Sequence, residues 1–209
     1  MPTPRTIAID GPAGAGKSTI GALVAERLGY LFLDTGAMYR AVALAGLRRG
    51  IDPDDAPTLG SLAREIRVAI GPPTVRDGRT YTVLLDGTDV TWDIRSAEID
   101  RIVSQVARVP EVRDAMVAQQ RTLAERGRVV MVGRDIGTVV LPRADRKVFL
   151  TGATGLVGGQ LLHDLLQFPH VEELVCLVRP AHGLSGRERL AQKLRRAGVK
   201  GKALDEAMS

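Results

Sequence analysis

The residues best suited to chemistry lie near the N-terminus, in the segment GPAGAGKST at residues 11–19. This segment fits the pattern G-x-x-x-x-G-K-[ST] and directly follows an apolar run at residues 7–9. Glycines at this spacing let successive backbone N–H groups converge on one concavity that suits a polyphosphate, and the adjacent lysine and serine suit the β- and γ-phosphates and Mg²⁺. We therefore predict an ATP site formed by Gly11, Gly14, Ala15, Gly16, Lys17, Ser18 and Thr19, with Ser18 as the metal ligand.

The pattern needs a strand before the loop and a helix after it, and the sequence predicts both. Residues 7–10 predict a buried strand, and Ile20, Leu23, Val24 and Leu28 fall on one face of a helix that Gly29 ends. The alternative, a glycine-rich turn that happens to contain lysine and serine, does not explain these flanking elements. The positive end of the helix would face the bound anion.

The rest of the chain alternates between apolar strands and helices. Further strands are predicted at residues 30–33, 128–132, 147–150 and 174–178, and helices at 36–49, 57–71, 96–108, 111–126, 155–167 and 187–196. Continuously apolar strands separated by helices indicate a parallel sheet covered on both faces. We expect an α/β fold with a doubly wound, five-stranded parallel sheet.

A small β element interrupts this alternation. Residues 74–76 and 80–85 are rich in β-formers, and each run is followed by an Asp-Gly pair, at Asp77-Gly78 and at Asp86-Gly87. Asp-Gly between such runs predicts hairpin turns. We therefore expect short antiparallel strands inserted into the α/β chain.

The composition is ordinary for a soluble globular protein. The chain has 209 residues, 25% of them charged, and a net charge of +5 that is spread along the sequence. Three Phe, three Tyr and one Trp are too few for a base-stacking surface, so we expect no nucleic-acid partner. The lone Cys176 suits a reducing compartment, and no leader or long apolar run is present. We expect a cytoplasmic monomer without a membrane partner.

Candidate acceptor residues stand where the predicted strands end and on the helices beside the β element. Ligands of open parallel sheets bind at the carboxyl ends of the strands. Transfer of a phosphoryl group requires that both anions be held and neutralised, and arginine forks suit a monophosphate. Arg40, Arg113 and Arg134 could supply the forks, while Ser104 and Asp135 could bond a base or ribose. For each arginine alone, pairing with a surface carboxylate is the alternative.

Several segments in series resemble one family. IAIDGPAGAGKST, LDTGAMYRAVAL, DVTWDIRSAEI, SQVARVPEVRDAM and VGRDIGTVVLP are closely similar to bacterial cytidylate (CMP/dCMP) kinases over residues 5–151. The resemblance implies a P-loop nucleoside monophosphate kinase fold and ATP-dependent phosphorylation of CMP or dCMP. It also implies that residues 72–91 are the monophosphate-binding insert. The residues implied to hold CMP are Thr35, Arg40, Ser104, Arg113, Arg134 and Asp135, with Lys17, Arg134 and Asp135 as catalytic residues.

After Leu150 the resemblance changes. The glycines Gly152, Gly155 and Gly158 lie between a predicted strand and a helix, and Arg179 follows the next strand. This βαβ pattern resembles the start of extended short-chain dehydrogenases of the thioester-reductase type and implies an NADP site at these four residues. No tyrosine follows Tyr81, so the Tyr-x-x-x-Lys pair of those enzymes is absent from the chain.

We therefore divide the chain into a kinase-like core at residues 1–150 and a Rossmann-like fragment at residues 151–209. The fragment stands where cytidylate kinases carry an arginine-rich lid, and arginines that meet the transferred phosphoryl group contribute about 10³-fold or more to rate. We expect ATP and CMP binding with much reduced turnover. The alternatives are a nucleotide-binding protein without catalysis and an NADP-binding oxidoreductase fragment.

Overall fold

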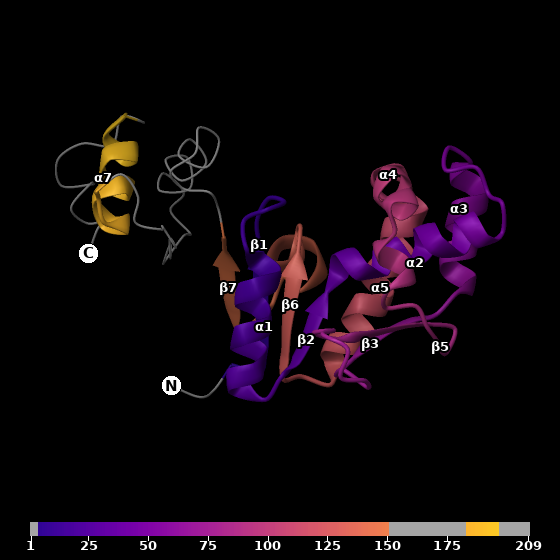
Figure 1. The fold of residues 1–209 in the computed structure, drawn as a ribbon, viewed down its shortest axis with the longest axis horizontal. Coiled ribbons are helices and arrows are strands. Elements are labelled where there is room, and N and C mark those ends of the chain that lie inside the picture. The colour runs from indigo at the N-terminus through magenta and orange to yellow at the C-terminus, as the bar shows by residue number, and fades with distance from the viewer. Residues whose placement is uncertain (1–3, 151–182, 197–209) are drawn as a thin grey trace.

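The computed structural model describes residues 4–150 and 183–196, and its central layer is a parallel sheet (Figure 1). The strands are β1 (Thr6–Asp10), β2 (Leu31–Asp34), β6 (Val129–Gly133) and β7 (Arg146–Phe149), in the order β2-β6-β1-β7. All three pairings are parallel, and the central residues of β1 and β6 are buried. The predicted parallel α/β sheet is confirmed for these four strands, whereas the predicted strand at 174–178 lies outside the described residues.

The helices of the described residues are α1 (Lys17–Leu28), α2 (Thr35–Arg48), α3 (Ala56–Glu65), α4 (Ala97–Val106), α5 (Pro110–Glu125) and α7 (Gly186–Arg196), with a 3₁₀ turn η1 (Asp93–Arg95) and a π-helical turn η2 (Ile136–Val140). The helix predicted at 187–196 is therefore confirmed, and the one predicted at 155–167 lies outside the described residues. Helix α1 lies over the sheet, and α2 to α5 gather beyond β2 (Figure 1). None of the helices in residues 4–150 and 183–196 combines the length and apolarity needed to cross a bilayer.

Helix α1 packs on the sheet through its smallest residues, and three of the four residues predicted on its apolar face, Ile20, Val24 and Leu28, are partly buried against the core. Gly21 and Ala25 are the buried positions, and a Cβ on Gly21 would lie 2.5 Å from Cγ1 of Val132. Leu23, one of the four residues expected on the packed face, is 52% exposed. Apolar spacing cannot reveal this, because close approach of helix and sheet favours the residue that lacks a side chain.

Helix α2 forms the interior of the structure and begins at the sheet edge. The Asp34 side chain caps it by accepting a hydrogen bond of 3.0 Å from the Gly36 N–H. Nine residues of α2 are buried, and Ala41, Val42 and Ala43 have no exposed surface. The cap fixes where the helix starts, so the side chains of its first turns are aimed at the carboxyl ends of the strands.

The inserted β element is a three-stranded antiparallel sheet made of β3 (Val68–Gly71), β4 (Thr82–Leu85) and β5 (Thr88–Asp89). The predicted turn at Asp86-Gly87 is confirmed: φ is 50° and 85° at these residues, as a type I′ hairpin requires. Two expectations are wrong. The helix predicted over 57–71 ends at residue 65, because residues 68–71 pair with β4, and residues 74–76 form no strand.

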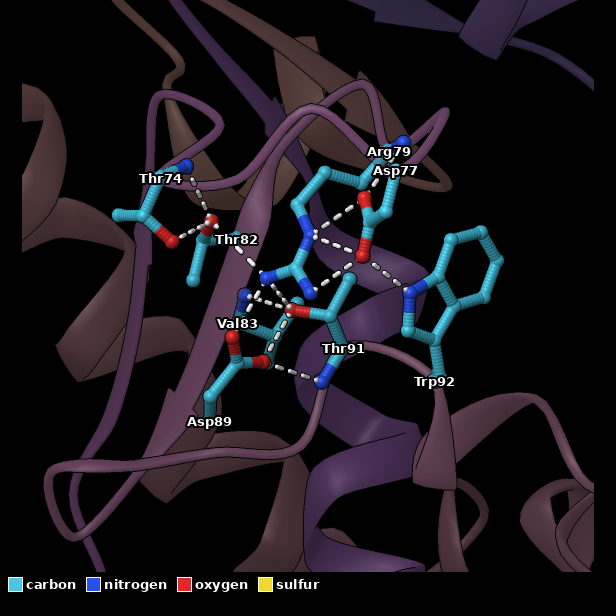
Figure 2. Close-up of polar contacts among 8 residues, drawn as sticks. All are labelled: Thr74, Asp77, Arg79, Thr82, Val83, Asp89, Thr91 and Trp92. Carbon is cyan, nitrogen blue, oxygen red and sulfur yellow. Dashed lines mark hydrogen bonds and ion pairs between the residues drawn. The ribbon is translucent and has the colours of Figure 1, made fainter.

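The segment between β3 and β4 is fixed by the side chain of Arg79 (Figure 2). Its guanidinium bonds both carboxylate oxygens of Asp77 and also reaches Asp89 on β5, and the arginine side chain is only 6% exposed. The indole N–H of Trp92 donates to Asp77 at 2.8 Å. The loop containing the predicted Asp77-Gly78 turn is therefore held by a polar network instead of by a strand pairing.

Candidate nucleotide site

The phosphate loop has the backbone shape that the sequence predicts. Gly11, Gly14 and Gly16 have φ of 148°, 75° and 85°, values that side chains disfavour. A Cβ at Gly11 would also lie 1.9 Å from the carbonyl oxygen of Leu150, at the end of β7. Helix α1 begins at Lys17, directly after Gly16. The N–H groups of its first turn therefore face the space that the loop encloses.

Lys17 lies inside this loop. Its ammonium group donates to the Pro12 carbonyl at 2.8 Å. Partial burial lowers the pKa of Lys17, an effect that the Asp34 carboxylate opposes and the Arg134 guanidinium strengthens. The lysine is thus a cation held partly out of water beside a second cation, an arrangement that favours an anionic ligand.

Ser18 and Asp34 lie together at the mouth of the loop, where a nucleotide-bound Mg²⁺ would sit. The Ser18 hydroxyl donates to Asp34 at 2.9 Å. No group of three or more His, Cys, Asp or Glu capable of holding a metal occurs in the described part of the chain. Mg²⁺ at nucleotide sites is held mainly by phosphates and water, with one or two protein oxygens, so this pair fits the ion.

A cavity of about 650 Å³ opens beside the loop and brings most of the predicted residues together. Those that line it are Lys17, Ser18, Thr35, Arg40, Ser104, Arg113 and Arg134. They come from α1, α2, α4, α5 and the end of β6, so five segments contribute to one surface. Asp135 joins this group through its ion pair with Arg113, at 3.2 Å.

The arginines of this cavity are only partly neutralised. Arg113 is 45% exposed and has Asp135 as its carboxylate partner. Arg40 is 31% exposed, pairs with Asp100 at 2.6 Å and donates to the Ile94 carbonyl. No ion pair of Arg134 occurs among the residues that the structure describes. The cavity therefore retains positive charge that an anion could use.

Thr35 and Ser104 differ in how their hydroxyls are placed. Thr35 is 4% exposed, and its hydroxyl donates to the Val132 carbonyl at 3.0 Å. A Cβ on Gly133 would lie only 2.1 Å from that hydroxyl oxygen, so Thr35 packs tightly against the end of β6. Ser104 is exposed on α4 and lines the cavity. The Thr35 hydroxyl is thus used in a hydrogen bond to β6, whereas Ser104 lies exposed at the cavity.

A second cavity, of about 690 Å³, shares Ser18, Asp34 and Arg40 with the first. It is lined in part by Thr19 and Leu23 of α1 and by Tyr81 and Arg95. The Arg95 guanidinium stacks 5.6 Å from the centre of the Tyr81 ring, and burial raises the pKa of Tyr81 to about 12. Thr19, predicted to bind ATP, thus lines this second cavity as a continuation of the loop.

Two polar residues have roles in the structure that the sequence did not assign to them. Gln120 lines the first cavity with 1% of its surface exposed, and its buried Nε2 has no hydrogen-bond partner in the described region. It lies seven residues after Arg113, a spacing that places both on one face of a helix and could have identified it. Asp10, at the end of β1, accepts two backbone hydrogen bonds from residues 136 and 137. No local pattern indicates that contact.

The predicted NADP residues cannot be placed in this site. Gly152, Gly155, Gly158 and Arg179 lie outside the described residues. The described part of the 151–209 segment is helix α7 and the three residues before it. The dinucleotide site therefore stays a prediction from sequence.

Comparison with known proteins adds two family matches. The family model described as Cytidylate kinase matches residues 7–176, and the one described as Male sterility protein matches residues 150–209. The two matches overlap over residues 150–176. The overlap coincides with the point where the sequence changes its resemblance.

Individual relatives of the first family are similar over most of the chain. A cytidylate kinase of Chloroflexus aggregans is 63% identical over 150 residues, which are 72% of this chain and 65% of that protein. One of Roseiflexus castenholzii is 56% identical over 151 residues, with the same two shares, and one of Herpetosiphon aurantiacus is 50% identical over 150 residues, 66% of its length. The chain thus spans about 65% of the length of these relatives.

Proposed function

The chain belongs to the cytidylate kinase family, and on that premise we propose that it transfers a phosphoryl group from ATP to CMP or dCMP. The observation that carries the proposal is the cavity of about 650 Å³ in which Lys17 meets Arg40, Arg113 and Arg134. A nucleoside monophosphate kinase needs a triphosphate cradle and an acceptor clamp that face one another. The residues that would form both line one cavity.

On the donor side, the loop would hold the β- and γ-phosphates of ATP. Backbone N–H groups from Gly14 to Thr19 and the start of α1 would surround the phosphates, and Lys17 would exchange its Pro12 carbonyl for them. Ser18 and Asp34, 2.9 Å apart, would hold the Mg²⁺ that accompanies ATP. The ion would neutralise charge on the β- and γ-oxygens.

On the acceptor side, Arg40 and Arg134 would bind the 5′-phosphate of the monophosphate. Both line the cavity together with Lys17, and guanidinium forks match phosphate oxygens geometrically. An acceptor oxygen held there attacks the γ-phosphorus while the bond to the β-phosphate oxygen breaks, giving CDP or dCDP and ADP. The protein contributes alignment and charge neutralisation.

Base selection would fall to Arg113, Asp135 and Ser104. Cytosine offers acceptors at O2 and N3 and a donor at its exocyclic amine, whereas uracil carries a donor at N3 and an acceptor at O4. A guanidinium and a carboxylate held 3.2 Å apart offer the complementary pair of groups to cytosine. Uracil would place like groups opposite each other, leaving buried polar groups unpaired.

The proposal is tested by binding and by turnover. We expect calorimetric titration of the full chain to show CMP binding that is tighter than UMP binding. We also expect ATP-dependent ADP release with CMP, at a rate well below that of ordinary nucleotide kinases. Lys17→Ala should abolish ADP release, whereas Arg27→Ala, exposed in the last turn of the same helix, should not. A wild-type chain that binds neither CMP nor ATP would refute the proposal.

A second function, NADP binding by the C-terminal segment, is favoured by the match of residues 150–209 to the Male sterility protein family. The expected outcome is NADPH binding that survives Lys17→Ala and is lost on Gly155→Asp. Loss of NADPH binding in Lys17→Ala would contradict the proposal that NADP and ATP bind at two separate sites. We also propose a monomer located in the cytoplasm, to be tested by gel filtration and cell fractionation.

A further inference from the structure

Asp10 connects the phosphate loop to the acceptor side of the cavity. It is the last residue of β1 and directly precedes Gly11. One carboxylate oxygen accepts a hydrogen bond of 2.6 Å from the Ile136 N–H, and the other accepts one of 2.7 Å from the Gly137 N–H. Both oxygens are thus used on backbone groups 126 and 127 residues away in sequence.

The backbone that Asp10 holds directly follows two predicted site residues, Arg134 and Asp135. Asp135 has a φ of 59°, a left-handed conformation that residues with a side chain rarely adopt. Its carbonyl accepts hydrogen bonds from Val139 and Val140, at 2.8 and 3.1 Å, while its carboxylate meets Arg113. A turn of this kind persists only where its surroundings hold it.

The space around the turn is tight on both sides. In the parallel pairing of β1 and β6, Asp10 lies opposite Gly133. A Cβ on Gly137 would lie 3.2 Å from the Asp10 carboxylate and 3.1 Å from the Lys147 side chain. The residues between Gly133 and Gly137, including Arg134 and Asp135, therefore span two points that are both fixed.

We propose that Asp10 is a positioning residue for the acceptor nucleotide, because its carboxylate fixes the turn that presents Arg134 and Asp135 to the cavity. This inference rests on the proposed function. The inference also couples the two halves of the site, because the residue that directly precedes the phosphate loop sets the location of the acceptor groups. Without this carboxylate, two backbone N–H groups lose their acceptor and the left-handed turn loses its anchor.

A matched control exists near the opposite end of the same strand. Asp145 accepts hydrogen bonds from the N–H groups of Arg5 and Thr6, both at 2.8 Å, and from the Thr6 hydroxyl at 3.0 Å. It joins distant segments through its carboxylate as Asp10 does, but the residues that it bonds, Arg5 and Thr6, do not adjoin the cavity, whereas the turn that Asp10 holds directly follows Arg134, which lines it. A purely structural role for Asp10 would give the two variants the same behaviour.

The experiment compares Asp10→Asn with Asp145→Asn in the full chain, by calorimetric titration with CMP and with ATP and by thermal unfolding. We expect both variants to unfold at lower temperature. Only Asp10→Asn should weaken CMP binding, by about tenfold, the effect of losing one hydrogen bond to a charged group. ATP binding should change by less than CMP binding does. Removing a negative charge near an anion site would by itself tighten binding, so the expected sign is opposite to that of simple electrostatics.

Asp10→Glu serves if the asparagine variant does not fold, because it keeps the charge but displaces the carboxylate. It should also lose CMP affinity. Wild-type CMP affinity in Asp10→Asn or Asp10→Glu, or equal losses for CMP and ATP, would overturn the inference and leave the proposed function intact. A wild-type chain that does not bind CMP would overturn both.

Discussion

Arginines in two regions of the molecule are used in opposite ways. In the β insert, the Arg79 guanidinium is surrounded by Asp77, Asp89 and two threonine hydroxyls, and its side chain is 6% exposed (Figure 2). In the cavity, Arg113 has a single carboxylate partner and is 45% exposed. The first arginine has its donors satisfied inside the protein, and the second keeps donors available.

The difference shows how a structural arginine can be distinguished from one that awaits a ligand. Two carboxylates around one guanidinium leave no attraction for an external anion, so Arg79 stabilises the insert. One carboxylate shared at the edge of a cavity leaves the guanidinium able to bind a phosphate or a base. The following predictions test this contrast, from the largest expected effect to the smallest.

Arg79→Gln should have the largest effect, and it should be on stability. Removing the guanidinium leaves Asp77 and Asp89 side by side without a cation, which we expect to lower the melting temperature by about 5–10 °C. Thermal unfolding would measure this change. CMP affinity, measured in the same samples below the transition, should change by less than threefold.

The control for this variant is Arg49→Gln. Arg49 also forms a two-bond pair, with Glu65 at 2.9 and 3.1 Å, but its side chain is 45% exposed. Exposed pairs contribute little, so its melting temperature should stay close to that of wild type. Equal losses in the two variants would contradict the distinction between enclosed and exposed arginines.

Arg113→Ala should show the reverse pattern. Losing the proposed charge-assisted contact between Arg113 and the base should weaken CMP binding roughly 10- to 100-fold, with little change in melting temperature. Arg121, two turns later on α5, donates to the Val139 and Val140 carbonyls at 2.7 and 3.1 Å. Arg121→Ala should therefore lower the melting temperature and leave calorimetric CMP affinity unchanged. If Arg121→Ala lost CMP affinity and Arg113→Ala did not, the ligand-binding role given to Arg113 and the structural role given to Arg121 would both be wrong.

Gln120→Met should weaken binding with little change in stability. The buried Nε2 has no partner within hydrogen-bond geometry in the described residues, so an apolar side chain removes an unsatisfied donor, but the Gln120 side chain also interacts with the Tyr39 hydroxyl, and losing that interaction offsets the gain. If the nucleotide supplies the missing acceptor, CMP affinity falls. Denaturant unfolding and calorimetry measure the two effects.

Its neighbour Gln119 provides the matched control, since it accepts from the Val68 N–H at 2.9 Å and donates to the Ile66 carbonyl at 3.0 Å. Gln119→Met should destabilise the protein without changing CMP affinity. Unchanged CMP affinity in Gln120→Met would show that the free amide serves no ligand.

The smallest effect should be a pH dependence of the Arg79 network. The Thr91 hydroxyl, together with Arg79, lowers the pKa of Asp89 to about 2, and hydrogen bonds from Arg79 and then Trp92 hold the pKa of Asp77 well below its usual range. Folded-state pKa values below the unfolded value of about 3.9 give stability that is full above pH 4 and declines as the pH falls toward 2. The difference in melting temperature between wild type and Arg79→Gln should be constant from pH 7 to 5. This difference in melting temperature should shrink below about pH 4, as the two carboxylates become protonated. A difference that grows below pH 4 would contradict the lowered pKa values of Asp77 and Asp89.

Local patterns predicted much of the fold because they depend on nearby residues. The phosphate loop, the parallel strands and the turn at Asp86-Gly87 each follow from spacing or backbone preference within a few positions. Predictions failed where distant residues decided the outcome. Residues 68–71 are a strand because β4 pairs with them, and α1 packs through Gly21 because β6 approaches it closely.

The sequence by itself determined the phosphate loop, the family resemblance and which arginines were candidates, since these depend on residue type and local spacing. Only the tertiary structure decided that Arg113 remains available while Arg79 is enclosed, that Gln120 has a free buried amide, and that Asp10 holds a turn 126 residues away. The physical reason is that a polar side chain can bind a ligand only if the protein leaves some of its donors, acceptors or charge without a partner. Which partners come within hydrogen-bond distance is decided by the fold, because they lie on segments far apart in the chain.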